Sequence, residues 1–531
     1  MRKAFLMMLS LILVLSMLAA CTSKSNSKEN VKSKVEINKE GYPIVDKKIT
    51  MSMMGPDVGQ AKWKDMAFFK EMEKMTNVNY EFTTPPISDF QTKLNLAFAS
   101  GEIPDVLFGA SLTSEQEVKY GKEGVLIPLE DLIEKYAPNI QKVLEENPDV
   151  KNSITTVDGH IYALPMVDKN AVWYMGPLWF NGKWLNALGV KELPQTTDEL
   201  YTLLKRFKTE DPNGNGKEDE IPFTSMKNSS NSLDGARQWL LGAFGFTTWG
   251  IEEMDGKVVY TPAEEGYKEY LTFMNKLYTE KLMDPETFSQ SNEQKKAKGQ
   301  ANQLGLFQDW FSYFTTGDKE EEALDDPMYQ PISSSITDKA VAPLSPGIYR
   351  GQFAVTNKAA NPEAAIRWVD YLYSKEGNEL LNIGKEGDVW AWADEASGTR
   401  KLLESPIEGK TIEDFRGTTT PDYGINVPAL RHKIEGFPES EFTKFTNSET
   451  DVKIKPYAKV PYPLVYLTPE EQEEVGRIRA DLDTYIEQME AKFITGAEPL
   501  SNWDKYNKTL NEMGVDKLVN IYQDAYDRWN K

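Results

Sequence analysis

Apolar positions after residue 46 recur with two periods, one typical of strands and the other of helices. Residues 47–57 (KKITMSMMGPD) contain an apolar run that ends in a Gly-Pro turn, which indicates a buried strand. Residues 63–75 carry apolar side chains at helical spacing, and residues 78–84 (VNYEFTT) alternate as a strand does. A second helix is predicted over residues 88–100, before the tight turn and apolar strand of SGEIPDVLFGA. Strands that alternate with helices predict an α/β fold with crossover connections.

The first residues have the pattern of a secretory signal. Two basic residues precede a mostly apolar run over residues 4–20, and small residues stand directly before Cys21. A membrane-spanning anchor is the alternative, because about 17 residues is the lower limit for crossing a bilayer. Cys21 is the only cysteine of the chain and cannot form an internal disulfide, so lipidation explains it better than folding does. We expect a lipoprotein signal peptide over residues 1–20 and a lipid on Cys21.

The residues after the cysteine predict a tether. Residues 21–45 are rich in Ser, Lys, Asn and Glu and lack a hydrophobic period, which indicates a flexible segment. We therefore expect a protein that is lipid-anchored at the extracellular face of the cell membrane. The chain has 60 basic against 82 acidic residues, a formal net charge of −22. Such a protein is repelled by phosphate backbones, so we expect no nucleic-acid partner.

Five segments between residues 98 and 381 carry a resemblance to a known family that extends from about residue 48 to about residue 395. They are FASGEIPDVLFGA (98–110), GVLIPLEDLI (124–133), VDGHIYALPM (157–166), WFNGKWLNALGVKELPQTTDELYTLLKRF (179–207) and FAVTNKAANPEAAIRWVDYLYSKEGNELL (353–381). In this order they resemble the family 1 extracellular solute-binding proteins, the substrate receptors of ABC importers. The large lipoproteins of Gram-positive bacteria and the alginate-oligosaccharide receptors are the most similar branches.

The resemblance implies a two-lobed α/β fold with a ligand cleft and a hinge between the lobes. It places residues 46–166 and 341–385 in an N-terminal lobe, and residues 167–340 and 386–531 in a C-terminal lobe. A ligand held between two lobes can stabilise a closed state through contacts that the open state lacks. The resemblance also implies a monomer that captures an oligosaccharide, docks on the transmembrane subunits of an ABC permease and performs no chemistry.

A calcium-loop pattern follows a predicted helix. Thr196 and Glu199 are spaced as a capping box, and an amphipathic pattern continues to about Lys208. In the next stretch, DPNGNGKEDEIP (211–222), oxygen-bearing side chains occupy positions 1, 3, 5 and 9 of a calcium loop. Position 12, where an EF-hand has a bidentate Glu, is Pro222, so the loop is not an EF-hand.

The ligand set for this ion comes from the resemblance. The alginate-binding relatives have a loop of this kind that is similar to a calcium site, and its ligands correspond to Asp211, Asn213, Asn215, the Lys217 carbonyl, Asp219 and Glu220. We expect a structural Ca²⁺, because these are hard oxygen donors in the number that calcium takes. The alternatives are magnesium and a polar turn without an ion.

Aromatic side chains are the signal for carbohydrate. Sugar rings pack their apolar C–H faces on Trp and Tyr, while their hydroxyls need charged or amide partners. Trp310 matches the position where sugar-binding relatives have a stacking aromatic, and core packing is the alternative for each Trp. Polar candidates come from strand-to-helix turns, where open sheets bind ligands. The candidate ligand-binding residues are Ser111, Asp168, Trp239, Asp309, Trp310, Arg350, Trp390 and Trp392.

Arg350 raises the question of ligand charge. An acidic sugar such as a uronide needs a fork-shaped cation inside a protein whose overall field repels it, and Arg supplies that bidentate geometry. A neutral sugar has no such need. The sequence leaves the charge of the sugar open.

Enzyme chemistry has little support in the sequence. His160 and His432 are the two histidines of the chain, which leaves almost nothing for a metal-hydrolase site or a Ser-His-Asp triad. We therefore expect no enzyme. A surface glycoside hydrolase or polysaccharide lyase stays an alternative, because any two of the 82 carboxylates could form a catalytic pair. A receptor for peptides or another non-sugar solute is the other alternative.

Overall fold

The computed structural model describes residues 35–227 and 235–531, and residues 37–531 form one compact unit. The expected signal peptide over residues 1–20 and the expected lipidation site Cys21 lie outside the described residues. Among the described helices, none combines the length and the apolar character that a membrane span requires.

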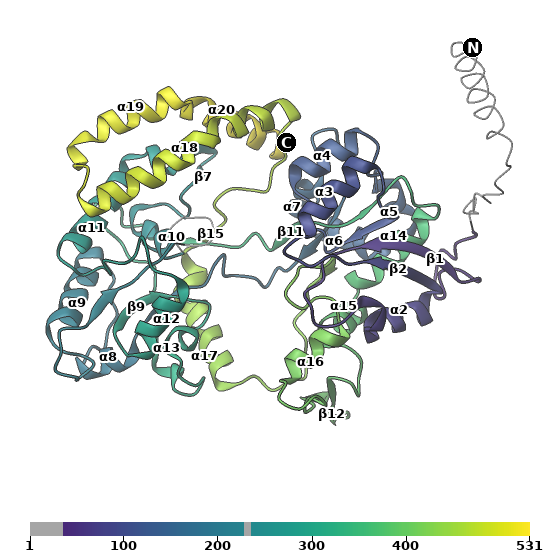
Figure 1. The fold of residues 1–531 in the computed structure, drawn as a ribbon, viewed down its shortest axis with the longest axis horizontal. Helices are drawn as coiled ribbons and strands as arrows, with labels where there is room; N and C mark the ends of the chain where they lie inside the picture. The colour runs from purple at the N-terminus through teal and green to yellow at the C-terminus, as the bar shows by residue number, and fades with distance from the viewer. Residues whose placement is uncertain (1–34, 228–234) are drawn as a thin grey trace, which may run out of the picture. The chain divides into compact units, whose positions relative to one another are not determined.

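The first lobe is built on a six-stranded sheet with the strand order β14-β4-β11-β3-β1-β2 (Figure 1). β1 pairs in parallel with β2 and β3, and β14 pairs in parallel with β4. β11 runs antiparallel to both of its neighbours, β3 and β4. Every strand except β11 therefore ends at the same edge of the sheet. The strands are β1 (Ile49–Met54), β2 (Val78–Thr83), β3 (Val106–Phe108), β4 (Leu164–Val167), β11 (Ile348–Val355) and β14 (Ala429–Leu430).

Helices cover both faces of this sheet. Successive side chains of a strand point to opposite faces, so neighbouring residues of one strand contact different helices. Leu107 of β3 belongs to an apolar cluster with Leu94 of α3. The next residue, Phe108, has its ring centroid 5.9 Å from Trp368 of α14 and 6.2 Å from Phe69 of α2. The helices of this lobe are α2 (Ala67–Thr76), α3 (Phe90–Ser100), α4 (Ser114–Lys122), α5 (Glu130–Tyr136), α6 (Pro138–Glu146), α7 (Pro148–Ile154), α14 (Pro362–Asp370), α15 (Lys375–Ile383) and α16 (Ile412–Thr419).

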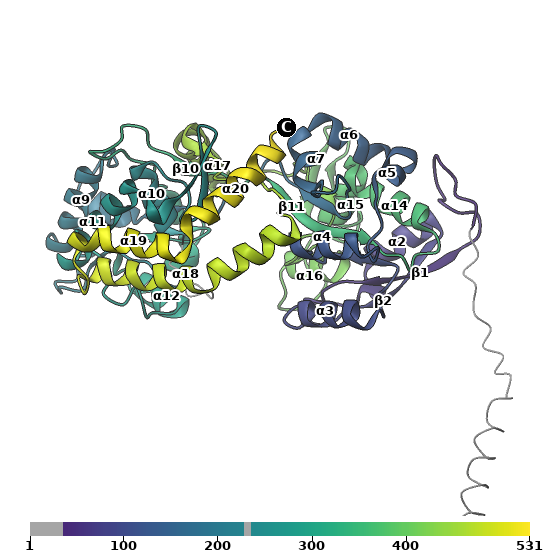
Figure 2. The same cartoon turned by 90° about the horizontal axis from the view of Figure 1, so that it is seen from above.

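The second lobe is built on a smaller sheet with the strand order β5-β9-β6, whose strands are β5 (Leu178–Phe180), β6 (Ile221–Phe223) and β9 (Leu304–Gln308). β9 runs parallel to β6 and antiparallel to β5. The last three helices of the chain lie beside one another, and α18 packs on α11 of this lobe (Figure 2). The start of α18 also contacts α4 of the first lobe, and the side chain of Asn152 donates to the carbonyl of Trp529 at the end of α20. The helices are α8 (Gly182–Ala187), α9 (Thr197–Thr209), α10 (Ala236–Leu241), α11 (Glu265–Thr279), α12 (Asn292–Gln300), α13 (Ser312–Thr316), α17 (Glu441–Glu449), α18 (Pro469–Thr495), α19 (Trp503–Met513) and α20 (Val515–Trp529).

Three two-stranded ladders complete the structure. They are β7 (Ile251–Met254) with β8 (Lys257–Tyr260), β10 (Ala342–Pro343) with β15 (Ala458–Lys459), and the hairpin of β12 (Trp390–Asp394) with β13 (Thr399–Leu402).

The chain passes between the two lobes through residues 168–177, 344–347 and 431–440. Two of these connections are hydrogen-bonded to each other: Asp168 N donates to Gly347 O at 2.7 Å. The segment over residues 458–468 is also hydrogen-bonded to the second of these connections, because Leu344 N donates to Lys459 O at 2.9 Å. A motion of one lobe relative to the other therefore has to bend several linked segments together.

Residues 386–431 lie with the first lobe, whereas we expected them in the C-terminal lobe. Their strand β14 forms one edge of the six-stranded sheet, and Arg400 of β13 forms an ion pair with Glu379 of α15 at 2.9 Å. A strand of two residues gives no period for sequence analysis to detect, which explains the different boundary.

Candidate functional site

The carboxyl edge of the six-stranded sheet brings together two of the predicted polar residues. Ser111 follows β3 and Asp168 follows β4, and a parallel sheet binds ligands at this edge. Ser111 adopts a positive φ of 48°, and its hydroxyl lies 3.4 Å from Gln352 Oε1. Asp168 Oδ1 accepts a hydrogen bond from Asn170 N at 3.0 Å. Both side chains therefore offer hydrogen-bonding groups where a ligand would lie.

Arg350 is engaged with the segment over residues 458–468. Its guanidinium lies over the Tyr466 ring, 4.4 Å from the centroid, and Nη1 donates to Val465 O at 3.1 Å and to Ser153 O at 3.4 Å. Tyr466 in turn donates its hydroxyl to Glu117 Oε2 at 2.7 Å, and burial raises the pKa of Glu117 to about 7. In this structure Arg350 therefore holds main-chain carbonyls, and an acidic sugar would have to compete with them.

The second lobe presents Asp309 and Trp310 at the carboxyl end of β9. Trp310 is 51% exposed, and its ring centroid lies 6.4 Å from that of Trp173. Asp309 accepts hydrogen bonds from Thr315 Oγ1 at 2.7 Å and from Trp310 N at 2.8 Å. The exposed indole beside an anchored carboxylate combines an apolar face with a hydrogen-bond acceptor. Trp310 and Asp309 were predicted from the sequence as candidate ligand-binding residues, whereas Trp173 was not. Trp173 reaches this edge from the first connection between the lobes.

Three of the predicted Trp residues have covered rings. Trp239 of α10 is fully buried and donates Nε1 to Gly176 O at 2.9 Å, so it packs in the core of the second lobe rather than at a cleft. Trp390 and Trp392 of β12 pack edge to face, 5.2 Å apart. The guanidinium of Arg400 lies over both rings, 4.5 Å and 4.8 Å from their centroids. A ligand would have to displace Arg400 before it could stack on that side of either ring.

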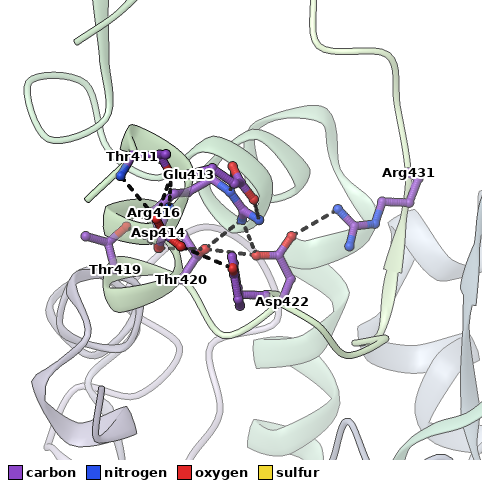
Figure 3. A network of polar contacts seen from close by, with 9 residues as sticks. Thr411, Glu413, Asp414, Arg416, Thr419, Thr420, Asp422 and Arg431 are labelled. Atoms are coloured by element: carbon purple, nitrogen blue, oxygen red, sulfur yellow. Dashed lines mark hydrogen bonds and ion pairs between the residues drawn. The ribbon is translucent and has the colours of Figure 1, made fainter. Parts of the chain in front are cut away.

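A charged cluster that the sequence did not indicate lies at the β14 end of the same edge (Figure 3). Asp422 is buried, and its Oδ1 accepts hydrogen bonds from Arg416 Nη1 at 2.6 Å and Thr420 Oγ1 at 2.9 Å. Its Oδ2 accepts from Arg431 Nη1 at 3.1 Å. Arg416 also forms a bidentate pair with Glu413, at 2.8 Å and 2.6 Å. The cluster therefore fixes Arg431 directly after β14.

The predicted calcium loop joins α9 to β6. Asp211 adopts a positive φ of 47°, and its carboxylate accepts hydrogen bonds from Asn215 N and Gly216 N, both at 3.1 Å. The side-chain amides of Asn213 and Asn215 donate to Asp219 Oδ1 at 3.1 Å and 3.0 Å. In residues 35–227 and 235–531, no three His, Cys, Asp or Glu side chains gather closely enough to hold a metal. In this structure the side chains of Asp211, Asn213, Asn215 and Asp219 form hydrogen bonds within the loop.

Glu220 shows that the loop nevertheless suits a cation. Its carboxylate is buried, and among the described residues Oε1 has no hydrogen-bonding partner. Burial raises the pKa of Glu220, and the neighbouring carboxylates of Asp219 and Asp211 raise it further. A cation among these oxygens would supply the missing partner and offset the repulsion, and oxygen donors of this kind suit calcium.

Comparisons with known proteins agree with this architecture. A family model described as bacterial extracellular solute-binding protein matches residues 56–379. The fructooligosaccharide ABC transporter substrate-binding protein FusA of Streptococcus pneumoniae is 31% identical over 97% of this chain and 96% of its own length. Lipoprotein LipO of Bacillus subtilis is 24% identical over 99% of this chain and 98% of its own length.

A solved structure of S. pneumoniae FusA, an EF-hand mutant in complex with fructo-nystose, matches with a TM-score of 0.73 and 28% identity. The match covers 91% of this chain and 99% of that chain. The predicted two-lobed α/β fold is thereby confirmed. Members of this family bind solutes and do not transform them, so the protein is not an enzyme. From the family match and the shared fold, we conclude that the chain belongs to the bacterial extracellular solute-binding proteins.

Proposed function

We propose that this protein captures an oligosaccharide outside the cell and delivers it to an ABC importer. The observation that carries the proposal is the exposed indole of Trp310, which lies beside Asp309 at the carboxyl end of β9. Stacking on the indole would hold the apolar face of a sugar ring. FusA, which is similar over nearly the whole chain, is a fructooligosaccharide-binding protein, and this supports a fructooligosaccharide as the first ligand to test.

The two sheet edges have different roles in this proposal. On the second lobe, Trp310 packs against a sugar ring and Asp309 accepts hydrogen bonds from its hydroxyls. On the first lobe, Ser111 and Asp168 exchange hydrogen bonds with other hydroxyls of the same ligand. Because a ligand bound to both edges favours the closed state, it bends the linked connections between the lobes and creates the form that the permease subunits bind.

Anchoring and assembly are also proposals. A lipid on Cys21 would hold the protein at the extracellular face of the membrane, with residues 21–36 as the tether between the lipid and the lobes. This tether ends earlier than the expected residue 45, because Ile44 and Val45 are buried and Arg367 donates hydrogen bonds to the carbonyls of Lys39 and Gly41. We place residues 37–167 and 348–430 in the first lobe and residues 178–343 and 441–531 in the second. Residues 341–343 differ from the expected boundary, because Val341 N donates to Gly242 O and Ala342 packs in the core of the second lobe. The protein acts as a monomer, since one copy carries both sheet edges.

A structural Ca²⁺ belongs to the same proposal. The side-chain oxygens of Asp211, Asn213, Asn215, Asp219 and Glu220 and the carbonyl of Lys217 would hold it. For this the amides of Asn213 and Asn215 would turn their oxygens toward the ion. The ion would fix the end of α9 relative to β6 and would take no part in ligand chemistry. The EF-hand mutation in the FusA structure supports an ion site in a relative.

The test is a calorimetric titration of residues 37–531 with kestose, nystose, an oligogalacturonide of similar length and a peptide mixture, followed by mass spectrometry of the sugars. Saturable binding of an intact neutral or acidic sugar is expected. Cleaved sugar would contradict the absence of enzyme activity. Binding of peptides with no response to any sugar would replace the oligosaccharide with a peptide ligand.

A further inference from the structure

A small pocket lies between α16 and the β12–β13 hairpin. Its volume is about 340 Å³, and its walls include Arg431 and the buried Asp422. We propose that this pocket binds one neutral sugar unit of the oligosaccharide, and that Arg431 donates hydrogen bonds to the hydroxyls of that unit. The inference rests on the proposed function and adds a subsite that sequence analysis did not predict.

Arg431 is connected to the edge where the other polar candidates lie. Its backbone N donates to Val167 O at 2.7 Å, so the residue stands directly beside Asp168. Its side chain reaches from there toward the buried carboxylate of Asp422 (Figure 3). Arg431, one wall of the pocket, therefore lies at the carboxyl edge of the sheet. An oligosaccharide bound by Asp168 could extend from there into the pocket.

The hydrogen bonds of the cluster leave one nitrogen of the Arg431 guanidinium, Nη2, available to a ligand. Arg431 uses Nη1 for Asp422 and Nε for Met166 Sδ at 3.4 Å. Among the described residues, no partner accepts a hydrogen bond from Nη2. A guanidinium has five N–H donors, so Arg431 can bind a ligand without releasing Asp422. Both oxygens of Asp422 are already occupied, which makes its role the positioning of Arg431.

Charge balance favours a neutral ligand. The cluster contains two cations, Arg416 and Arg431, and two anions, Glu413 and Asp422, and each Arg pairs with at least one of the carboxylates. No net positive charge is therefore left to stabilise a third carboxylate, brought by a ligand, in this partly buried place. A hydroxyl group accepts a hydrogen bond from Arg431 without bringing a charge that must be desolvated.

The remaining walls suit the apolar side of a sugar ring. Ile383, Val389, Leu402 and Ile412 line the pocket, and Asn382 adds an amide. Ligand pockets for small molecules range from about 300 to 1,000 Å³, so a volume at the lower end fits a single ring rather than a chain of rings. The pocket therefore combines aliphatic walls, a fixed donor and room for one unit.

Three variants test the inference in calorimetric titrations with kestose and nystose. Arg431→Gln removes the guanidinium, and Leu402→Trp fills the pocket from a side chain that takes no part in the charged cluster. Both are expected to weaken binding of the best neutral sugar at least about tenfold. Arg206→Gln is the control, because Arg206 of α9 also pairs with a carboxylate and a carbonyl but lies outside the pocket.

Melting temperatures separate ligand recognition from folding. If Arg431→Gln lowers the melting temperature strongly, the sugar affinity of Leu402→Trp is the test of the subsite, because this variant leaves Asp422 and its partners unchanged. Sugar binding by both variants within twofold of the unaltered protein would overturn the subsite while leaving the proposed function intact. Tighter binding of an oligogalacturonide than of nystose, abolished by Arg431→Gln, would overturn the neutral charge class. An unaltered protein that binds no sugar would overturn the proposed function and this inference together.

Discussion

Trp310 and Trp239 show how much the environment of one residue type decides its role. Both are Trp residues of the second lobe, but Trp310 is half exposed while Trp239 is fully buried in the core. An exposed indole keeps an apolar face in water, which a sugar ring can cover. A buried indole contributes to packing and has no face left for a ligand.

Replacing Trp310 with Ala should therefore weaken sugar binding without unfolding the protein. We expect at least about a tenfold rise in Kd, which corresponds to about 1.4 kcal/mol, with little change in melting temperature. Tyr42→Ala is the control, because Tyr42 is also exposed and lies in the N-terminal segment. Calorimetric titration measures the change, and unchanged affinity in the Trp310 variant would remove this residue from the site.

Buried carboxyl groups make the stability of the protein depend on pH. Burial raises the pKa of Glu117 to about 7 and the pKa values of Asp326 and Asp370 to about 6. The folded protein therefore holds these protons at a pH where the unfolded chain has released them. Because the folded protein then binds more protons than the unfolded chain, the contribution of these groups to the free energy of unfolding is greatest below about pH 4 and falls as the pH rises through about 7.

Glu117→Gln should flatten this dependence. An amide can still accept the Tyr466 hydroxyl but does not titrate, so the loss of stability between about pH 5 and 8 should shrink by up to about 3 kcal/mol. Urea unfolding at several pH values measures the slope. Glu134→Gln, a change at an exposed position, is the control. If the free energy of unfolding of the Glu117→Gln variant depends on pH as steeply as that of the unaltered protein, Glu117 is already ionised in the folded protein near pH 5.

At the scale of elements, the calcium loop links a helix to a sheet. It begins two residues after α9 ends and leads into β6, which pairs with β9. An ion that fixed the loop would therefore stabilise the register of the second sheet. A free carboxylate oxygen on buried Glu220 is the feature that such an ion would satisfy.

Calcium should raise the melting temperature of the protein, and a chelator should reverse the rise. At a calcium concentration of 100 times its Kd, the expected stabilisation is about 2.7 kcal/mol. Asp211→Ala should abolish this response. Glu218→Ala should keep it, because Glu218 lies in the same loop but is not among the proposed ligands. Thermal unfolding in calcium, magnesium and chelator tests all three statements, and a response that survives Asp211→Ala would assign the ion to another place.

Elements with a strong local pattern could be predicted from the sequence, and elements set by distant partners could not. The predicted strand over residues 47–57 contains β1, and the predicted helix over residues 88–100 contains α3. The N-cap at Thr196 appears as predicted, since its side chain accepts from Glu199 N, but the reciprocal bond of a capping box does not form, because the Glu199 carboxylate accepts from Gln195 N instead. β14 has two residues and is a strand because β4 lies beside it.

The same distinction applies to the site. Trp310 was selected because it matches the position of a stacking aromatic in sugar-binding relatives, and Asp309 because it is the neighbouring residue. The position of Arg431 is set by its contacts with Asp422 and Val167, and Arg416 helps to hold Asp422 in place. Val167 lies more than 260 positions away in the chain. Local periodicity contains no information about such a partner. The unexpected burial of Trp239 has the same cause, since its neighbours come from several elements of the second lobe.

At the scale of the whole molecule, the order of the strands should prevent a contiguous first lobe from folding alone. A fragment over residues 37–167 contains β1 to β4 but lacks β11, which pairs with β3 and β4, and β14. We expect this fragment to lack cooperative unfolding and the amide dispersion of a folded protein in NMR spectra. A fragment with a sharp unfolding transition would show that the remaining strands pair differently.

The late arrival of β11 and β14 also affects the timing of folding during synthesis. A chain that emerges with its N-terminus first presents β1 through β4 long before residue 348, the start of β11. Until then β3 and β4 lack the strand between them, and their unpaired edges are open to aggregation and proteolysis. Pairing over such distances is slow, because loop closure must precede the contacts that reward it. We therefore expect the first lobe of the nascent chain to stay incompletely folded until β11 and β14 have been synthesised, and such a chain can still be threaded through a translocation channel.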